Sequence, residues 1–159
     1  MKTIEITQEN AIKAYKEATG EFKKAILNLI GSKNLNLKLI DRLNTFEDCC
    51  QELDIHPDAV LPFKNPASKD HISINAYAKL IIIIKAHREG WEPDWANSNQ
   101  YKYFPWFEYK KSSSGFGFSF AAYLSWYTGT TAAARLCLQN SDLAVSVGKK
   151  FESIYNEYL

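Results

Sequence analysis

The chain has 159 residues and a mass of 18.2 kDa, which is an ordinary size for one domain. It carries 19 Lys and Arg residues against 18 Asp and Glu residues, so its formal net charge is +1. This balance excludes disorder driven by charge. It also excludes a strongly basic protein that holds nucleic acid by bulk electrostatics.

The sequence predicts a cytoplasmic protein without a membrane anchor. The longest apolar run, residues 80–84, is far shorter than the roughly 20 residues that cross a bilayer, and the N-terminus lacks a hydrophobic signal core. The three cysteines are an odd number, and Cys49 and Cys50 are adjacent while Cys137 is distant. We expect free structural thiols, with no disulfide, no metal and no cofactor.

Residues 8–30 are predicted to be helical because their apolar side chains recur at helical spacing. Thr7 is the expected N-cap, and Gly31 is the expected residue of the C-terminal cap. Gly20 interrupts the pattern. The stretch is therefore one kinked helix or two short ones.

Two further helices are predicted in the middle of the chain. Residues 45–48, Thr-Phe-Glu-Asp, resemble a capping box that opens a helix through about Leu53. Residues 72–89 follow a helical stripe, and Gly90 stands where a left-handed residue is expected. The middle of this second helix is apolar all round, which indicates a central helix covered on more than one side.

From residue 91 the pattern changes to that of strands. Residues 101–109 and 115–127 are rich in aromatic and small side chains, and residues 135–138 favour a third short strand. Asn140 is the expected N-cap of a single final helix. The fold class is therefore α+β, with a helical N-terminal half, an antiparallel sheet of about three strands and a C-terminal helix packed together.

We expect one domain over residues 1–159, because the sequence contains no internal repeat and no linker. Within it, residues 1–44 are a helical N-terminal extension. Residues 45–159 are the main body with the aromatic-rich sheet.

Aromatic residues concentrate between Trp91 and Tyr127, a window that holds all 4 tryptophans. Part of this set must fill the core, because aromatic side chains bury large areas. Alternation along the second strand places three phenylalanines on one face, Phe116, Phe118 and Phe120. It places Gly115, Gly117 and Ser119 on the other. Nearly bare backbone of this kind marks a place where a ligand or a neighbouring ring comes close.

The loop before the first strand, residues 91–100, combines tryptophans with Asp and Asn side chains. Such residues recognise polar ligands, and they equally make the local bonds of turns. The candidate ligand-binding residues are Trp91, Asp94, Trp95, Asn97, Asn99, Tyr101, Lys102, Tyr103, Trp106, Gly115, Gly117, Ser119 and Arg135.

Two motifs in this region are distinctive, EGWEPDW at residues 89–95 and SGFGFS at residues 114–119. Together with Arg-Leu-Cys at residues 135–137, they resemble a group of small uncharacterised proteins encoded by phages and prophages of Bacteroidota. The resemblance covers roughly residues 45–159. It implies a viral or mobile-element origin and a role in the host cell or the virion. It assigns no activity and no site residue.

Motifs of catalysis are weak in this sequence. His87-Arg88-Glu89 lacks the second histidine of a zinc-protease helix, and residues 114–117 lack the lysine of a P-loop. Adjacent Cys49 and Cys50 do not have the spacing of a zinc site. We therefore expect a binding protein and not an enzyme.

Three functions remain open. The first is binding of a nucleotide or a nucleotide-derived signal on the aromatic and glycine-rich surface, to counter host defence, with Lys102 and Arg135 at the phosphates. The second is binding of single-stranded nucleic acid, which the near balance of charges in the window disfavours. The third is a virion or assembly component, a homo-oligomer whose aromatic surface is a subunit interface.

Overall fold

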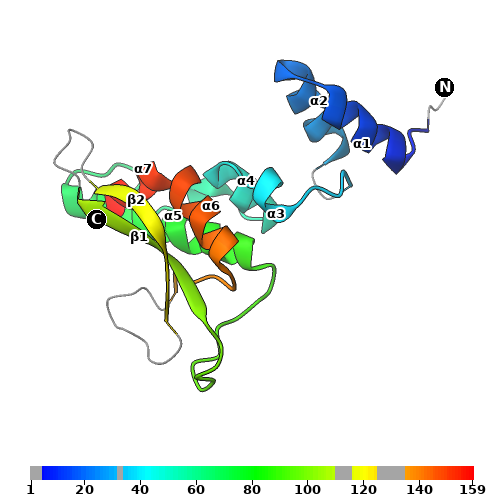
Figure 1. The fold of residues 1–159 in the computed structure, drawn as a ribbon. Helices are drawn as coiled ribbons and strands as arrows, with labels where there is room; N and C mark the ends of the chain where they lie inside the picture. The colour runs from blue at the N-terminus through cyan, green and yellow to red at the C-terminus, as the bar shows by residue number, and fades with distance from the viewer. Residues whose placement is uncertain (1–4, 32–33, 110–115, 125–134) are drawn as a thin grey trace. The chain divides into compact units, whose positions relative to one another are not determined.

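The computed structural model describes residues 5–31, 34–109, 116–124 and 135–159 (Figure 1). The chain divides into two compact units, Met1–Arg42 and Leu43–Leu159. The division lies two residues before the predicted start of the main body.

The first unit contains α1 (Gln8–Glu17), α2 (Gly20–Ile30) and the short α3 (Leu39–Arg42). The predicted N-cap is confirmed, because Thr7 Oγ1 accepts a hydrogen bond from the amide of Asn10 at 3.3 Å.

Residues 8–30 form two helices, α1 and α2, and not one kinked helix. Ala18 is extended and Gly20 has a φ of 54°, which ends one helix before the next begins. Gly31, with a φ of 78°, is the C-cap of α2 as predicted. Small and aliphatic side chains form the core of this unit, namely Ala11, Ala18, Ile26 and Leu35.

The second unit begins with α4 (Phe46–Glu52) and the single turn η1 (Pro57–Ala59). The predicted capping box is confirmed in both directions. The Asp48 amide donates to Thr45 Oγ1 at 3.1 Å, and the Thr45 amide donates to Asp48 Oδ2 at 2.9 Å. Two of the orphan amides at the start of α4 are thereby satisfied.

The long helix α5 (Lys69–Arg88) begins three residues earlier than predicted. Its N-cap is Ser68, whose hydroxyl accepts from the His71 amide at 3.2 Å. At its other end Glu89, with a φ of 47°, is the left-handed residue, and Gly90 follows with a φ of 86°. In its middle Leu80, Ile83 and Ile84 are fully buried, whereas Ile81 and Ile82 are half-buried. α5 contacts α4, α6 and α7, as predicted for a helix covered on more than one side.

The sheet is a hairpin of two antiparallel strands, β1 (Lys102–Tyr109) and β2 (Phe116–Leu124). The prediction of a third strand over residues 135–138 is wrong. Within the described residues, this segment contributes a single bridge, in which Tyr103 and Leu138 exchange two backbone hydrogen bonds of 3.0 and 2.7 Å.

The predicted final helix is two helices, α6 (Ser141–Lys150) and α7 (Glu152–Tyr158). Asn140 is the N-cap, as predicted, and its Oδ1 accepts from the Leu143 amide at 2.9 Å. The chain leaves the helical conformation at Phe151, where φ is −112° and ψ is 21°. This break lets α6 and α7 take different directions.

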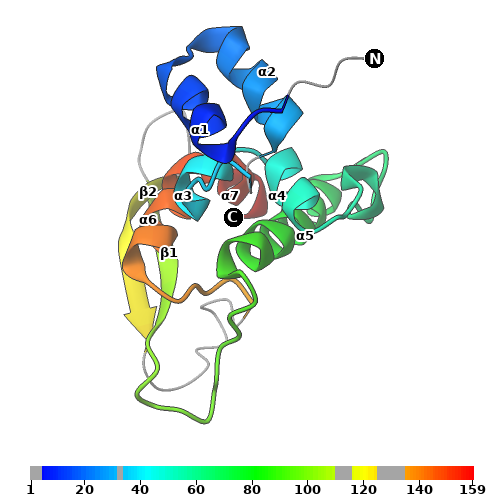
Figure 2. The same cartoon turned by 90° about the vertical axis from the view of Figure 1, so that its right-hand side faces the viewer.

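The elements of the second unit are stacked in layers. α6 packs on both strands, α7 packs on α5, and α5 in turn packs on α4. Figure 2 shows the two strands at one side of this unit and α5 at the other. In the described part of the chain, no helix has both the length and the apolar character that crossing a bilayer requires.

Candidate functional site

The loop of residues 91–100 is held from inside by a buried lysine. Lys102 Nζ donates hydrogen bonds to the carbonyl oxygens of Asp94 at 2.6 Å and Asn97 at 3.0 Å. The same ammonium lies 5.4 Å from the centroid of the Trp95 ring. Two carbonyl dipoles and an aromatic face thus compensate the ammonium for its lost hydration. Lys102 is therefore a structural anchor of the loop.

The acidic and amide side chains of this loop also serve its own turns. Asp94 Oδ1 accepts from the Ala96 amide, and Asn97 Oδ1 accepts from the Asn99 amide, both at 2.9 Å. Gln100 Oε1 accepts from the Asp94 amide at 2.7 Å. These are the side-chain to backbone bonds that Asp and Asn make in turns. They occupy part of the hydrogen-bonding capacity that a ligand would need.

The guanidinium of Arg88 connects the end of α5 to the segment before α6. Its Nε donates to the carbonyl oxygen of Cys137 at 2.8 Å, and one terminal nitrogen donates to the carbonyl oxygen of Arg135 at 3.2 Å. Glu92 lies 3.5 Å from the other terminal nitrogen, and the Trp91 ring centroid lies 5.5 Å from the guanidinium carbon. These contacts hold residues 135–138 close to α5, with only Leu138 bridged to β1.

A bulge in β2 changes which side chains face outward. Trp106 pairs with Phe120, and Phe107 pairs with Phe118, so Ser119 is the extra residue. Phe118 and Phe120 consequently lie on opposite faces, which corrects the predicted face of three phenylalanines. The Phe118 amide donates to Glu152 Oε1 at 3.2 Å.

The inner face of the hairpin packs on α6 and α7. The Phe107 ring stacks on Tyr155 with centroids 4.5 Å apart, and it meets Phe118 edge-on at 5.9 Å. Gly148 of α6 makes room for the Phe118 ring, because a Cβ at this position would overlap that ring.

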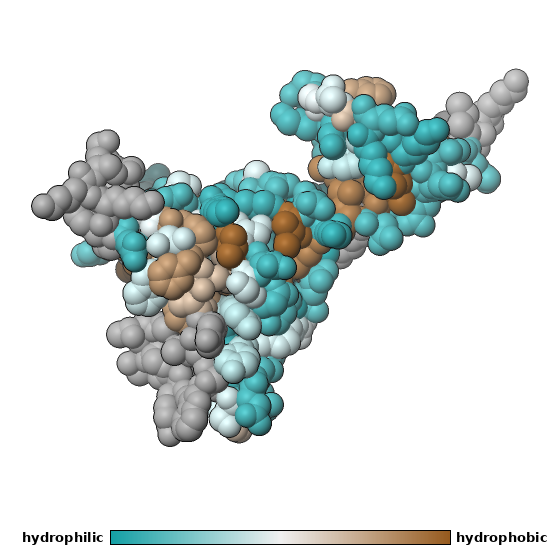
Figure 3. Space-filling model, in the orientation of Figure 1, coloured by the Kyte–Doolittle hydropathy of each residue, from teal (hydrophilic) through white to brown (hydrophobic). Residues whose placement is uncertain are grey.

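The outer face presents an exposed aromatic pair. The rings of Trp106 and Phe120 stack with centroids 6.0 Å apart, and these side chains are 44% and 48% exposed. Figure 3 shows apolar side chains gathered over β2. A contiguous exposed apolar surface is a candidate interaction site. We call Trp106 and Phe120 the outer aromatic pair.

The structure places the predicted site residues in several environments. Lys102 and Gly117 are buried, and Trp91 and Tyr103 are half-buried. The exposed members are Asp94, Trp95, Asn97, Asn99, Tyr101, Trp106, Ser119 and Arg135. Gly115 lies outside the described residues.

Some of these residues are brought together. Asp94, Trp95 and Asn97 surround Lys102, and the rings of Tyr101 and Tyr103 lie 6.3 Å apart. The Trp106 ring stacks on Phe120. Alternation along the strand placed Phe120 on the same face as Phe118, so it did not indicate this exposed pair.

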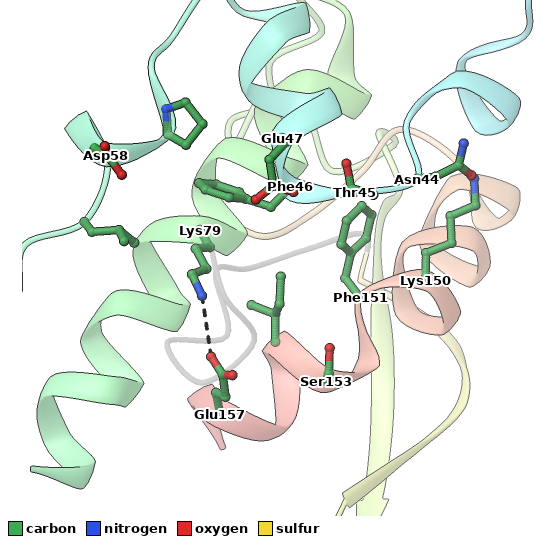
Figure 4. Close-up of a pocket in the computed structure, with 13 residues that line it drawn as sticks. Asn44, Thr45, Phe46, Glu47, Asp58, Lys79, Lys150, Phe151, Ser153 and Glu157 are labelled. Carbon is green, nitrogen blue, oxygen red and sulfur yellow. Dashed lines mark ion pairs between the residues drawn. The ribbon is translucent and has the colours of Figure 1, made fainter. Parts of the chain in front are cut away.

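A pocket that no sequence pattern predicted lies elsewhere in the second unit (Figure 4). Its volume is about 500 Å³, within the range of about 300–1,000 Å³ that small-molecule sites span. α4, η1, α5, α6 and α7 all contribute to its lining. The lining residues are Asn44, Thr45, Phe46, Glu47, Pro57, Asp58, Leu61, Lys79, Lys150, Phe151, Ser153, Ile154 and Glu157.

The pocket combines an apolar floor with charges of both signs. Phe46 and Phe151 line the pocket and are buried. Lys79 Nζ lies 3.7 Å from Glu157 Oε2, an ion pair drawn in Figure 4. Lys150 Nζ donates to the carbonyl oxygen of Leu43 at 3.2 Å.

The three thiols are buried, as expected for structural cysteines. Burial, with the nearby Asp48 carboxylate as a smaller cause, raises the pKa of Cys49 to about 12. Burial also raises the pKa of Cys137, although the Arg88 guanidinium acts in the opposite direction. Such thiols are poor nucleophiles, because the reactive form is the thiolate.

Among the described residues, no three His, Cys, Asp or Glu side chains are grouped so that they could hold a metal ion. Comparison of the chain with protein-family models, curated proteins and solved structures found no match.

Proposed function

We propose that this protein is a non-enzymatic binding protein that associates with a second copy of itself through the outer face of the β1–β2 hairpin. The observation that carries this proposal is the outer aromatic pair. Trp106 and Phe120 are stacked on each other and remain nearly half exposed. Tryptophan and other aromatic side chains are the preferred anchors of protein interfaces.

The pair suits a symmetric contact. Trp106 and Phe120 lie side by side on adjacent strands. A two-fold axis passing between them brings Trp106 of one copy against Phe120 of the other, and the reverse. Each contact is then made twice. A small patch therefore contributes more to the free energy of association than its area in one copy suggests.

The polar part of the predicted surface supports a ligand site less well. Lys102 is bound to two carbonyl oxygens of the loop, and Asp94 and Asn97 bond within their own turns. A nucleotide needs cationic groups or free amides at its phosphates. Self-association needs only the exposed rings.

A nucleotide-like ligand is the second candidate, and the exposure of Trp95 and Arg135 favours it. A base would stack on the tryptophan, and the guanidinium would bind a phosphate. In this proposal, which rests on the resemblance to phage-encoded proteins, either activity would take place in the host cytoplasm or the virion. A bound nucleotide signal would there be withheld from host defence.

Light scattering after size-exclusion chromatography tests the first candidate. We expect the wild-type protein to be a dimer or larger at micromolar concentration, and the Trp106→Ser and Phe120→Ser variants to be monomers. Ile74→Ser is the matched control, because Ile74 is 46% exposed on α5 and lies outside the hairpin. A monomeric wild-type protein contradicts the proposal.

Thermal shift with mononucleotides, dinucleotides and cyclic oligonucleotides tests the second candidate. A ligand that binds the folded state raises the unfolding midpoint. A rise that is lost in Trp95→Ala and in Arg135→Ala would favour the nucleotide function. No shift with any of these compounds rejects it.

A further inference from the structure

The pocket of Figure 4 is independent of the outer aromatic pair, and the function proposed above makes no use of it. We propose that this pocket binds a small zwitterion with a large apolar side chain, such as a free α-amino acid or a dipeptide. The juxtaposition of an apolar floor, a carboxylate and an ammonium carries the inference.

The floor suits an apolar side chain. Phe46 comes from the start of α4, Phe151 from the break between α6 and α7, and Ile154 from α7. Phe46 and Phe151 are otherwise buried in the core, so their positions are fixed before a ligand arrives. A pre-formed apolar surface of this kind binds without the cost of ordering it.

The charges suit a ligand that carries both signs. Glu47 of α4 and Lys79 of α5 line the same pocket from different elements. The first is placed to accept from an ammonium group, and the second is placed to donate to a carboxylate. Figure 4 shows both side chains around the same space.

The balance of charge disfavours a polyanion. The lining holds the carboxylates of Glu47, Asp58 and Glu157 against the ammonium groups of Lys79 and Lys150. A nucleotide polyphosphate would meet more negative than positive groups here, and like charges in one site repel. A zwitterion with no net charge avoids this repulsion.

The Lys79–Glu157 pair provides a test of the inference, because neutralising each of its two residues should change the ligand affinity in opposite directions. The 3.7 Å separation is long for an ion pair, and both side chains retain contact with solvent. A ligand carboxylate would compete with Glu157 for the same ammonium. Removing the charge of Glu157 should therefore strengthen binding, whereas removing the charge of Lys79 should weaken it.

Isothermal titration calorimetry with L-phenylalanine as the probe tests the proposal on the full chain. We expect a dissociation constant in the millimolar range or below. Phenylalaninamide, which lacks the carboxylate, and N-acetyl-phenylalanine, which lacks the ammonium, should each bind at least about tenfold more weakly. Phe-Gly and Gly-Phe distinguish a dipeptide site from an amino-acid site, according to which probe binds most tightly.

Variants then locate the site. Lys79→Gln and Glu47→Gln should each weaken binding of L-phenylalanine by about tenfold, and Glu157→Gln should strengthen it by a few fold. Denaturant unfolding of each variant controls for the fold. Trp106→Ser, which removes one ring of the outer aromatic pair, should leave the binding of L-phenylalanine unchanged.

Absence of binding by L-phenylalanine and both dipeptides at millimolar concentration overturns the proposal. So does a Glu157→Gln variant that weakens binding as much as Lys79→Gln does. Neither result bears on self-association, because Trp106 and Phe120 do not line this pocket.

Discussion

Arg88 Nε donates a hydrogen bond of 2.8 Å to the carbonyl oxygen of Cys137, 49 residues further along the chain. A terminal nitrogen of the same guanidinium lies 3.2 Å from the Cys137 sulfur. The guanidinium is buried, so these bonds replace the water that it has lost. The contact fixes the segment before α6 to the end of the central helix.

Replacing Arg88 should therefore destabilise the second unit. Arg88→Met keeps much of the apolar stem and removes the donors, which leaves buried carbonyl oxygens unsatisfied. We expect a loss of about 2 to 4 kcal/mol in the free energy of unfolding, measured with denaturant. Lys85→Met, at an exposed position of the same helix, is the control and should change little. Equal stability of the two variants would contradict the role given to Arg88.

Gly148→Ala separates helix propensity from packing. In an open helix this change stabilises by about 1 kcal/mol, because glycine is the poorer helix former. Here a Cβ would overlap the Phe118 ring and lie 3.0 Å from Pro105 Cβ. We expect a net destabilisation of about 1 to 3 kcal/mol. A higher unfolding midpoint for the variant would show that β2 does not approach α6 this closely.

Isoleucines of α5 should differ sharply in their tolerance of charge. Ile83 is fully buried, whereas Ile74 is 46% exposed. Ile83→Asp leaves an unpaired charge in the core, with a loss of about 3 to 5 kcal/mol that is comparable with total stability. Ile74→Asp should cost less than about 1 kcal/mol. Circular dichroism during thermal unfolding measures both, and similar midpoints would exclude a central α5.

Lys102→Met should loosen the loop of residues 91–100. The change removes the donor to the carbonyl oxygens of Asp94 and Asn97 and leaves the apolar stem in place. We expect a loss of about 1 to 3 kcal/mol in the free energy of unfolding, and faster cleavage within the loop in limited proteolysis. Unchanged stability, together with lost affinity for a phosphate-bearing ligand, would instead assign Lys102 to a binding site.

The buried thiol of Cys49 predicts a fall in stability at alkaline pH. Its pKa is raised from 9.0 to about 12 by burial, so the folded state retains a proton that the unfolded state releases. The contribution of this thiol to the free energy of unfolding is complete below pH 9 and is lost as the pH rises from 9 toward 12. The slope is about 1.4 kcal/mol per pH unit for one such group. Denaturant unfolding between about pH 8 and about pH 10 measures it, and Cys49→Ala should reduce the slope.

Local signals in the sequence were sufficient for several helix starts, although the Ser68 cap of α5 was not predicted. Thr7, the Thr45–Asp48 capping box and Asn140 were all predicted, because a cap is made by residues that are close in sequence. The break between α6 and α7 at Phe151 was not predicted. The apolar stripe continues across it, so nothing in the spacing of side chains indicates two helices.

The surface of the sheet was less predictable. The bulge at Ser119 depends on pairing with β1, and one extra residue reverses the face of every side chain that follows it. Aromatic composition drew attention to the region of Trp106, where the structure has Trp106 stacked on Phe120. Alternation alone then assigned Phe120 to the wrong face.

The pocket could not be predicted from the sequence. Glu47 and Lys79 are distant in the chain and occur among many other exposed charges. Only packing of α4, α5 and α7 brings them to one space. Similarly, the burial of Lys102 depends on how the preceding loop folds back over its side chain.

The single bridge between Tyr103 and Leu138 has a consequence for local opening of the hairpin. β1 is hydrogen-bonded to β2 along one edge, and at Tyr103 it is also bonded along the other. Fraying that separates the strands near Tyr109 therefore leaves the opposite end attached. In hydrogen exchange, the amides of Tyr103 and Leu138 should consequently be the last of the sheet to exchange, and protection should decrease along β1 toward Tyr109.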